Sequence, residues 1–485
     1  MQGVVMTALD LPATTGTTSP VRHPWRWVVF GVVFAANLMD IFDATIVNVA
    51  GPSIHTDLGG GTDTLQWLSA GYTLAFAVLL IAGARLGDIL GRRRLFLVGS
   101  AGFTIFSAAC ALSPDIGVLI AFRVLQGAFG ALMIPQGFGL MREVFDDKEF
   151  GKATGMFGPA MGLPMLAAPI VAGALVDADL WGTGWRLVFL INVPIGLVSF
   201  VLALKSLPRG ASRPGLKLDV TGTWLIGLAL VAIIYPLIQG QPEGWPAWTF
   251  VLLGVGLTLL FAFLRWEKRR GDDALIEPSL LANRTYLGGI AVVLALFGAF
   301  SGVLLCVSLY GQLGEGWSPI HAGLTLTPMV VGMVIGMVAG TMAVARLGRH
   351  VLHLGLAVIA LGAVEMAITV SGATSASSWD LVPGLLLIGA GAGASIGQLF
   401  QFVLSSVTMR EVGSASGVLE ATQQLSTSLG VAILGTIFFS GLGDHLPTHA
   451  LEITAWACLV PLAIAFALVF RLPMHAREEQ EQPAA

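Results

Sequence analysis

The chain has 485 residues, of which 55% are hydrophobic and only 11% are charged, with a mean hydropathy of +0.83. Soluble domains carry roughly 25% charged residues, so this composition excludes a water-soluble globular protein and indicates many membrane crossings. The net charge of −4 indicates no particular partner, because the distribution of charge between loops matters more than the sum, and no nucleic-acid partner is expected. The three cysteines stand far apart inside apolar runs, which gives neither a disulfide framework nor a metal-ligand spacing.

Fourteen apolar runs are long enough to cross a bilayer, for which a helix needs about 20 residues. Residues 1–24 lack the apolar core of a signal peptide, and they and residues 472–485 are expected to form cytoplasmic tails. The sequence therefore predicts an all-α polytopic membrane protein whose first helix is an uncleaved anchor. The predicted spans lie at 25–49, 64–84, 95–112, 115–140, 150–176, 184–206, 218–240, 247–267, 285–311, 320–342, 350–371, 378–402, 413–440 and 449–471.

The charges of the loops predict the orientation of these spans. When residue 1 is placed in the cytoplasm and the loops alternate, the outer loops carry acidic residues but no Lys or Arg. Of the basic residues, only Arg123 and Arg186 fall outside the inner loops and tails. This distribution follows the positive-inside rule, which an odd number of spans would break, so both termini are predicted to be cytoplasmic.

Two short internal matches divide the chain. Ala345–Gly348 repeats the Ala-Arg-Leu-Gly of Ala84–Gly87, and Gly413–Gly417 resembles Gly151–Gly155, in each case about 261 residues apart. Two matches at nearly one spacing predict a duplicated six-helix unit. The predicted organisation is a first six-helix half at 25–206, an inserted helix pair with its linkers at 207–283, and a second six-helix half at 284–471.

The first run contains two acids, Asp40 and Asp43, which lie three residues apart and share a helix face with Asn37 one turn earlier. If this helix ends near Val49, Asp43 lies about 9 Å and Asp40 about 13 Å below its outer end. Arg123 in the fourth run lies roughly 12 Å deep, so acid and base are predicted at a common depth. Ionisable side chains inside a membrane are costly, which favours a proton-binding site; the alternative is a structural ion pair that fixes helix packing.

Glu420 is a further intramembrane acid, about 12 Å into the thirteenth run. Its counterpart in the repeat is Gly158, so it is predicted to bind a cationic substrate or a second proton, or else to be a hydrogen-bonded side chain near the interface. Glu365 in the eleventh run is expected to be a protonated or snorkelling side chain, and Gln398 to line a cavity or cap a helix. The residues assigned to a substrate cavity are Asn37, Gln126, Gln398, Glu420 and Gln423.

Rows of glycines at four-residue spacing run along two of the predicted helices. Such rows let helix backbones approach closely, and here they are predicted to support sliding contacts between the halves. The rows are Gly151, Gly155, Gly158 and Gly162 in the fifth run, and Gly389, Gly393 and Gly397 in the twelfth.

A charged, glycine-rich loop, Gly83-Ala-Arg-Leu-Gly-Asp-Ile-Leu-Gly-Arg-Arg-Arg94, lies between the second and third runs. Gly87 and Gly91 permit a tight turn, and Asp88 can hold a helix N-terminus or an arginine of the same loop. The alternative is a loop that only fixes topology.

Two six-helix halves with such a loop resemble the major facilitator superfamily. Three stretches, Leu38–Ala50, Arg123–Gly127 and Gly184–Gly196, resemble the first-, fourth- and sixth-helix motifs of its fourteen-helix drug:proton antiporters. The resemblance implies that Asp43 occupies the acidic position of the family, with Asp40 and Arg123 beside it. It also implies that the loop is a cytoplasmic latch that stabilises the outward-facing state, formed by Gly83, Arg85, Gly87, Asp88, Gly91 and Arg92.

The fifth run departs from the family. Its antiporter motif ends in Gly-Pro followed by a pair of glycines, whereas this chain keeps Gly155 but then reads Ala168-Pro169 and Ala172-Gly173. The small residues are kept in character and Pro169 is expected to keep the bend. The motif residues are therefore Gly155, Pro169 and Gly173, with a weakened signal for export as against import.

The chain has no Gly-x-x-x-x-Gly-Lys-Ser/Thr phosphate loop and no metal spacing, so neither an ATP-driven pump, an enzyme nor a cofactor is expected. The resemblance implies a monomeric proton-coupled antiporter in the inner membrane of a bacterium, which exports drug-like amphipathic molecules by alternating access. The alternatives are a proton symporter that imports a metabolite and a non-transporting scaffold or receptor with the same fold. A scaffold would have no use for Asp40, Asp43 and Arg123 at one depth.

Overall fold

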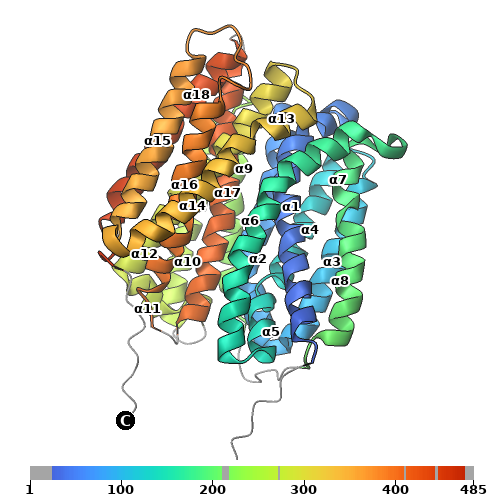
Figure 1. Cartoon of the computed structure of the whole chain (residues 1–485), viewed down its shortest axis with the longest axis vertical. Helices are drawn as coiled ribbons and strands as arrows, with labels where there is room; N and C mark the ends of the chain where they lie inside the picture. Colours follow the sequence, from blue (N-terminus) through green and yellow to red (C-terminus); the bar gives the residue numbers. More distant parts are fainter. Residues whose placement is uncertain (1–23, 210–217, 271–273, 409–410, 443–445, 476–485) are drawn as a thin grey trace, which may run out of the picture.

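The computed structural model describes residues 24–209, 218–270, 274–408, 411–442 and 446–475 as a bundle of long helices that run along one axis (Figure 1). Thirteen segments of this described part are long and apolar enough to cross a membrane. The one predicted run outside these thirteen is the fifth, at 150–176, which corresponds to the helix Asp147–Ala178, whose described apolar portion is Ala167–Ala178. The predicted all-α membrane class is confirmed.

The first half begins at α1 and ends at α8. Pro135 separates α4 from α5 and Asp115 caps the start of α4, where its carboxylate accepts the Val118 N–H at 2.9 Å. The helices are α1 (Arg26–Leu58), α2 (Thr62–Leu90), α3 (Arg92–Ala111), α4 (Ile116–Met133), α5 (Gln136–Val144), α6 (Asp147–Ala178), α7 (Leu187–Leu190) and α8 (Asn192–Ser206), with short 3₁₀ turns at Leu180–Gly182 (η1) and Gly184–Arg186 (η2).

The inserted pair and the second half follow in the same manner. The pair is α9 (Val220–Gln239) and α10 (Ala247–Arg270), which a short helix, α11 (Pro278–Ala282), joins to the rest. The second half contains α12 (Arg284–Leu309) with a π-helical turn at Tyr310–Gly314 (η4), α13 (Pro319–Thr325), α14 (Thr327–Leu347), α15 (His350–Val370), α16 (Val382–Leu404), α17 (Val412–Leu442) and α18 (Pro447–Val469).

Helices at the same position in the order of each half pack against corresponding helices of that half. In the first half α4 packs on α2 and α3, and α1 packs on α6 and α8; in the second half α16 packs on α14 and α15, and α12 packs on α17 and α18. The inserted helices α9 and α10 pack on each other, and α9 also contacts α2 and α17 behind the seam between the halves (Figure 1). The boundaries proposed for the three units stay predictions.

We call the end of the bundle where α1 begins and α18 ends the terminal end, and the opposite end the far end. The halves are joined at the far end, and Pro52 helps to join them. Proline has no N–H, so the carbonyl of Asn48, one turn earlier in α1, lacks its helical partner. The Ser308 hydroxyl of α12 donates to that carbonyl at 2.7 Å, and Gln312 donates to the Val49 carbonyl at 2.9 Å.

A second far-end crossing brings α6 against α13. The Ile320 N–H donates to the Asp177 carboxylate at 3.1 Å. A Cβ added at Gly173 would lie 2.5 Å from the Ile320 Cα, and one added at Gly323 would strike the Pro169 carbonyl. Gly173 and Pro169 of the predicted fifth-helix motif therefore lie at a contact between the halves, whereas the surroundings of Gly155 lie outside the described residues.

The glycine row of α16 is not at the seam, and that prediction is wrong. Gly389 and Gly393 lie against the backbone of Met329 and Met333 in α14, inside the second half, and Gly397 has no neighbouring atom within 4 Å of an added Cβ. Spacing shows that two backbones meet but not which ones. Helix α14 supplies its own row, in which Gly332, Gly336 and Gly340 lie against carbonyls of α16.

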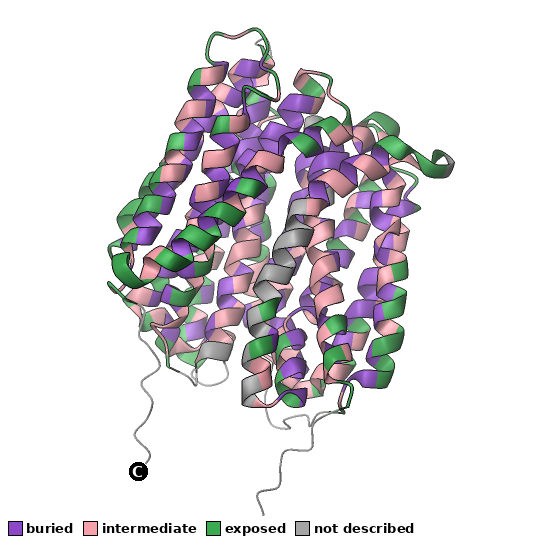
Figure 2. Cartoon of the chain, viewed as in Figure 1, coloured by how far each residue is buried: buried purple, intermediate pink, exposed green. Residues whose placement is uncertain are grey.

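The outward faces of the bundle carry large apolar side chains. Residues such as Val251, Ile335, Ile368 and Val460 are more than half exposed, and exposed positions run along the outer sides of the helices in Figure 2. A soluble protein rarely shows apolar patches of this extent, so these faces fit contact with lipid.

Candidate functional site

The centre of the first half contains an ion pair with no access to solvent. The Arg123 guanidinium on α4 donates from Nη1 to Asp43 Oδ2 on α1, and both side chains are 0% exposed. The acid and base predicted at one depth are therefore in contact. The predicted depth was too small: α1 continues to Leu58, which puts Asp43 about 22 Å from that end, near the middle of this 33-residue helix.

Neighbouring side chains hold the pair. Gln126 donates from Nε2 to Asp43 Oδ1 at 2.8 Å and accepts from Arg123 Nη1 at 3.0 Å. Arg123 also donates from Nε to the Leu68 carbonyl of α2 at 3.1 Å, and its guanidinium lies 4.3 Å from the Tyr72 ring centroid. Gln126 was expected in a substrate cavity, but it is 0% exposed and belongs to this network.

Helix α8 also contributes a side chain that contacts Asp43. Asn192 donates from Nδ2 to Asp43 Oδ1 at 3.2 Å and to the Ser107 hydroxyl of α3 at 3.2 Å, and Ser107 donates to the Phe189 carbonyl at 2.9 Å. Arg123 Nη2 and Asn192 Oδ1 are buried without a hydrogen-bond partner in the described part of the chain. The network is therefore close to satisfied but not fully so.

Asp40 has a different environment from Asp43. The Tyr72 hydroxyl donates to Asp40 Oδ1 at 2.5 Å, so the Tyr72 ring separates Asp40 from the buried guanidinium. Asp40 is half-buried and Asp43 is fully buried. The two acids were predicted as one pair, but they have different partners. Asp43, the inner acid, pairs with Arg123, and Asp40, the outer acid, bonds to the Tyr72 phenol.

Glu420 lies on α17, the second-half helix that packs on α2. It is half-buried, and Asp40 is the charged group that acts on it electrostatically. The next residue, Ala421, belongs to the apolar core of the first half. Glu420 and Asp40 therefore face the same seam from opposite halves.

The other predicted cavity residues are scattered. Asn37 donates to the Val33 carbonyl of its own helix at 2.9 Å, and Gln423 is half-buried on α17. Gln398 is 7% exposed and donates to the Thr341 hydroxyl of α14 at 3.3 Å, inside the second half. The structure does not bring Gln398 to the acids.

The predicted latch is a tight turn between α2 and α3, with Gly91 at φ 94°. Asp88 accepts from Arg92 at 3.1 Å, and Arg92 lies 3.9 Å from Glu143 on α5. Gln136 donates to the Gly83 carbonyl at 2.9 Å and occupies the space beside Gly87. These contacts all hold the loop to its own half.

Sequence reasoning missed Tyr72, Ser107 and Asn192. Asn192 was inside the quoted stretch Gly184–Gly196, where a lone amide among apolar residues was the available signal. Tyr72 and Ser107 gave no comparable signal, because a single hydroxyl in an apolar run shows nothing about what it faces.

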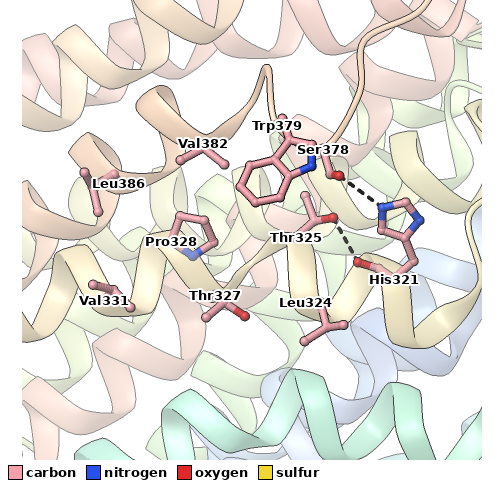
Figure 3. Close-up of a pocket in the computed structure, with 10 residues that line it drawn as sticks. All are labelled: His321, Leu324, Thr325, Thr327, Pro328, Val331, Ser378, Trp379, Val382 and Leu386. Atoms are coloured by element: carbon pink, nitrogen blue, oxygen red, sulfur yellow. Dashed lines mark hydrogen bonds between the residues drawn. The ribbon is translucent and has the colours of Figure 1, made fainter.

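A cavity of about 620 Å³ opens at the far end of the second half, away from the acids (Figure 3). Its walls come from α13, α14, the segment before α16 and the first turns of α16, and His321 bonds to Ser378 across it at 3.1 Å. It contains no carboxylate, and Trp379 at its edge is 82% exposed. It has no part in the acid site.

Among the described residues, no three side chains are grouped to hold a metal ion.

The sequence matches known proteins along most of its length. The family model described as Major Facilitator Superfamily matches residues 33–431. A probable actinorhodin transporter of Streptomyces coelicolor is 48% identical over 445 residues, covering 90% of this chain and 76% of the relative. A puromycin resistance protein of Streptomyces alboniger is 33% identical over 459 residues (92% and 89% covered), and a tetracenomycin C resistance and export protein of Streptomyces glaucescens is 32% identical over 429 residues (88% and 78%).

Two solved structures share the fold. An auto-inhibited POT family peptide transporter has a TM-score of 0.67 at 14% identity and covers 94% of this chain and 99% of its own. A D-xylose–proton symporter has a TM-score of 0.64 at 16% identity, with 93% and 98% covered. At these identities the likeness concerns the arrangement of helices alone.

Proposed function

The chain belongs to the major facilitator superfamily, and on that premise we propose that it is a proton-coupled antiporter that exports amphipathic, drug-like molecules from a bacterial cytoplasm. Relatives that match most of its length are named for transport of actinorhodin, export of tetracenomycin C and resistance to puromycin. These names support a small-molecule substrate and the outward direction. They favour an exporter over the importing symporter and over the scaffold.

The buried Asp43–Arg123 pair is the observation that best supports coupling between proton binding and transport. Breaking a buried ion pair by neutralising one partner costs about 3–5 kcal/mol, because the other charge is left buried and unpaired. A proton that reaches Asp43 therefore destabilises the present packing of α1 on α4. The packing then relaxes towards a second arrangement, which is the linkage that an alternating-access carrier needs.

Asp40 and Glu420 supply the surface that meets the substrate. They come from opposite halves and both are half-buried, and the Tyr72 ring lies between Asp40 and Arg123, the cation nearest to it among its described partners. A positively charged group on a substrate would be attracted to both. The positive charge of the bound substrate would lower the free-energy cost of ionising Asp43. Substrate binding would therefore favour release of the proton from Asp43.

The far-end contacts support a proposal for the transport state of this structure. Ser308, Gln312 and Ile320 close the halves at the far end, while the contacts of Asp88 and Arg92 lie within one half at the terminal end. We propose that the terminal end is cytoplasmic, that the state is inward-facing, and that the loop at 83–94 engages the second half only when the far end opens.

The chain is a multi-pass membrane protein, and we propose that it works as a monomer in the bacterial inner membrane with both termini in the cytoplasm. The basic loops found in the sequence support this orientation. The carrier performs no covalent chemistry and uses protons and a lipid bilayer as its partners.

The test is transport into inverted membrane vesicles with an imposed pH gradient, using puromycin, tetracenomycin C and actinorhodin as candidate substrates. Uptake of at least one compound should follow the gradient and collapse with a protonophore. Uptake that required ATP and ignored the gradient would overturn the proposal, as would a lack of difference between vesicles with and without the protein across a broad panel of toxic compounds.

A further inference from the structure

Two buried carboxyl groups meet at the terminal end of the inserted pair, outside the site described above. Asp219 precedes the first turn of α9, and Glu267 lies in the last turn of α10. Asp219 is 2% exposed and Glu267 is 0% exposed. Neither residue belongs to the six-helix halves, and the proton coupling proposed for Asp43 does not use them.

Asp219 has the partners of an ionised carboxylate. It accepts the Gly222 N–H at 3.0 Å and the Trp266 indole N–H at 2.8 Å, and Arg270 lies 3.4 Å away with a side chain that is 37% exposed. A helix N–H, an indole N–H and a guanidinium are donors that a carboxylate accepts.

Glu267 has the partners of a carboxylic acid. Its Oε2 accepts the Ile276 N–H at 2.8 Å, but its Oε1 is buried without a donor. A Cβ added at Gly222 would lie 2.8 Å from Glu267 Oε1 and 2.6 Å from Asp219 Oδ2, so the two oxygens border the same space. Two carboxylates so close in a dry site cannot both be ionised, and a proton on Oε1 gives this atom its missing bond, to Asp219.

We propose that Asp219 and Glu267 form a second proton-binding site, which holds one shared proton and thereby fastens the segment 274–276 to the seam between α2 and α17. A proton fits better than a metal ion. Hard cations take six or more oxygen ligands, whereas the space beside Gly222 is bordered by one oxygen of Asp219, one of Glu267 and a methyl group of Leu275.

The segment 274–276 lies beside helices of both halves and of the inserted pair. Leu275 and Ile276 line a cavity of about 110 Å³ together with Val78 of α2, Phe263 of α10 and Val418 of α17. The segment therefore touches both halves and the inserted pair at one place. None of the residues that line this cavity is charged. In the described part of the chain, Asp219 is the charged group that acts on Glu267, and Arg270 pairs with Asp219.

Loss of the shared proton to water would leave two negative charges in contact and only one partly exposed cation. Glu267, at the end of its helix, relieves the repulsion by turning outward, and the Ile276 N–H then loses its acceptor. The segment 274–276 loosens from the seam, and α2 and α17 become free to shift. The inserted pair therefore senses pH at the terminal end.

Hydrogen–deuterium exchange on the purified full-length protein in lipid nanodiscs tests this site without substrate or gradient, so its result is independent of the proposed antiport. After correction for intrinsic exchange, protection of the Ile276 amide should fall at least tenfold as pH rises through the titration of the pair. Glu267→Gln should keep protection constant with pH, because its amide donates to Asp219 and its carbonyl accepts from Ile276. Asp219→Asn, which removes the repulsion and still caps α9, should do the same.

Glu365→Gln is the matched control, since Glu365 also has a buried oxygen without a donor but lies in α15, away from the seam. Its exchange profile at Ile276 should equal that of the wild type. Protection independent of pH in the wild type, or a wild-type profile in both Glu267→Gln and Asp219→Asn, would overturn the proposal. Restoration of protection at high pH by sodium, at constant ionic strength, would overturn the choice of a proton.

Discussion

The contact between α2 and α4 in the first half and the contact between α14 and α16 in the second occupy equivalent places in their halves, and they share glycine packing but differ in charge. In the first, Gly127 lies against the Tyr72 carbonyl and Gly83 against the Ala131 carbonyl. Arg123 adds a buried charge there, since it bonds to the Leu68 carbonyl and lies over the Tyr72 ring. In the second, Gly336 and Gly389 bring one backbone directly against the other. At the repeat spacing of about 261 residues, Arg123 corresponds to Gly384 and Asp43 to Leu304.

The difference shows what the fold itself requires. The second half achieves the same packing with small and apolar residues, so the helices do not need a buried ion pair to associate. A buried pair is poor evidence for stability, because desolvation offsets most of its attraction. On the proposed mechanism, the charges of the first half serve proton coupling, a task that the second half does not share.

The largest expected effect separates the two halves by function. Asp43→Asn keeps the shape of the acid but removes its charge, so proton-driven export should fall at least a hundredfold while substrate still binds. Export into vesicles and equilibrium binding to purified protein measure the two quantities. Glu365→Gln in the second half should transport normally, and equal losses in both variants would remove the distinction between the halves.

A second expected effect tests the backbone contact of the second half. A Cβ at Gly336 would strike the Ala390 carbonyl, so Gly336→Ala should lower the free energy of unfolding by about 1–3 kcal/mol through overpacking. Thermal melting of the purified protein measures the change. Gly397→Ala is the control, since nothing lies within 4 Å of its added Cβ, and its melting temperature should equal or exceed that of the wild type.

Asn192 should show a smaller effect on activity. Asn192→Ala removes one donor to Asp43, and loss of a hydrogen bond to a charged group, about 1.5 kcal/mol, corresponds to roughly a tenfold slower export. The dependence of the rate on pH should change with it. Ser199→Ala, also buried on α8 but bonded to the Val32 carbonyl, should leave both the rate and its pH dependence unchanged. Matching pH profiles in Asn192→Ala and the wild type would remove Asn192 from the site.

The smallest expected effect lies at the far end. The Trp185 indole and Arg186 donate to Asp57 at 2.9 and 2.7 Å and hold the pKa of Asp57 below its usual value. Since the pKa is lower in the folded state, this stabilisation is complete above the unfolded value of about 3.9 and is lost as pH falls through the folded value. Asp57→Asn should lower the melting temperature slightly at pH 7 and progressively less towards pH 3. A difference that grew with acidity would contradict this sign.

Much of the fold follows from the sequence because apolar length alone locates a membrane helix. The end of α1 was missed because Gly51-Pro52 resembles a helix stop, whereas Pro52 stays helical and its freed carbonyl bonds to Ser308 instead. The contact between Asp43 and Arg123 was predictable from their common depth. The roles of Gln126 and Gln398 were not, because spacing along one helix does not show which neighbour a side chain meets.

The central claim is that Asp43 carries the proton that substrate displaces. The most direct measurement is proton release when substrate is added to purified protein in weakly buffered detergent solution, using a compound identified by vesicle transport. The wild type should release up to about one proton for each substrate bound, and Asp43→Asn should bind the compound and release none. Equal release from both proteins would place the coupling proton elsewhere and contradict the account.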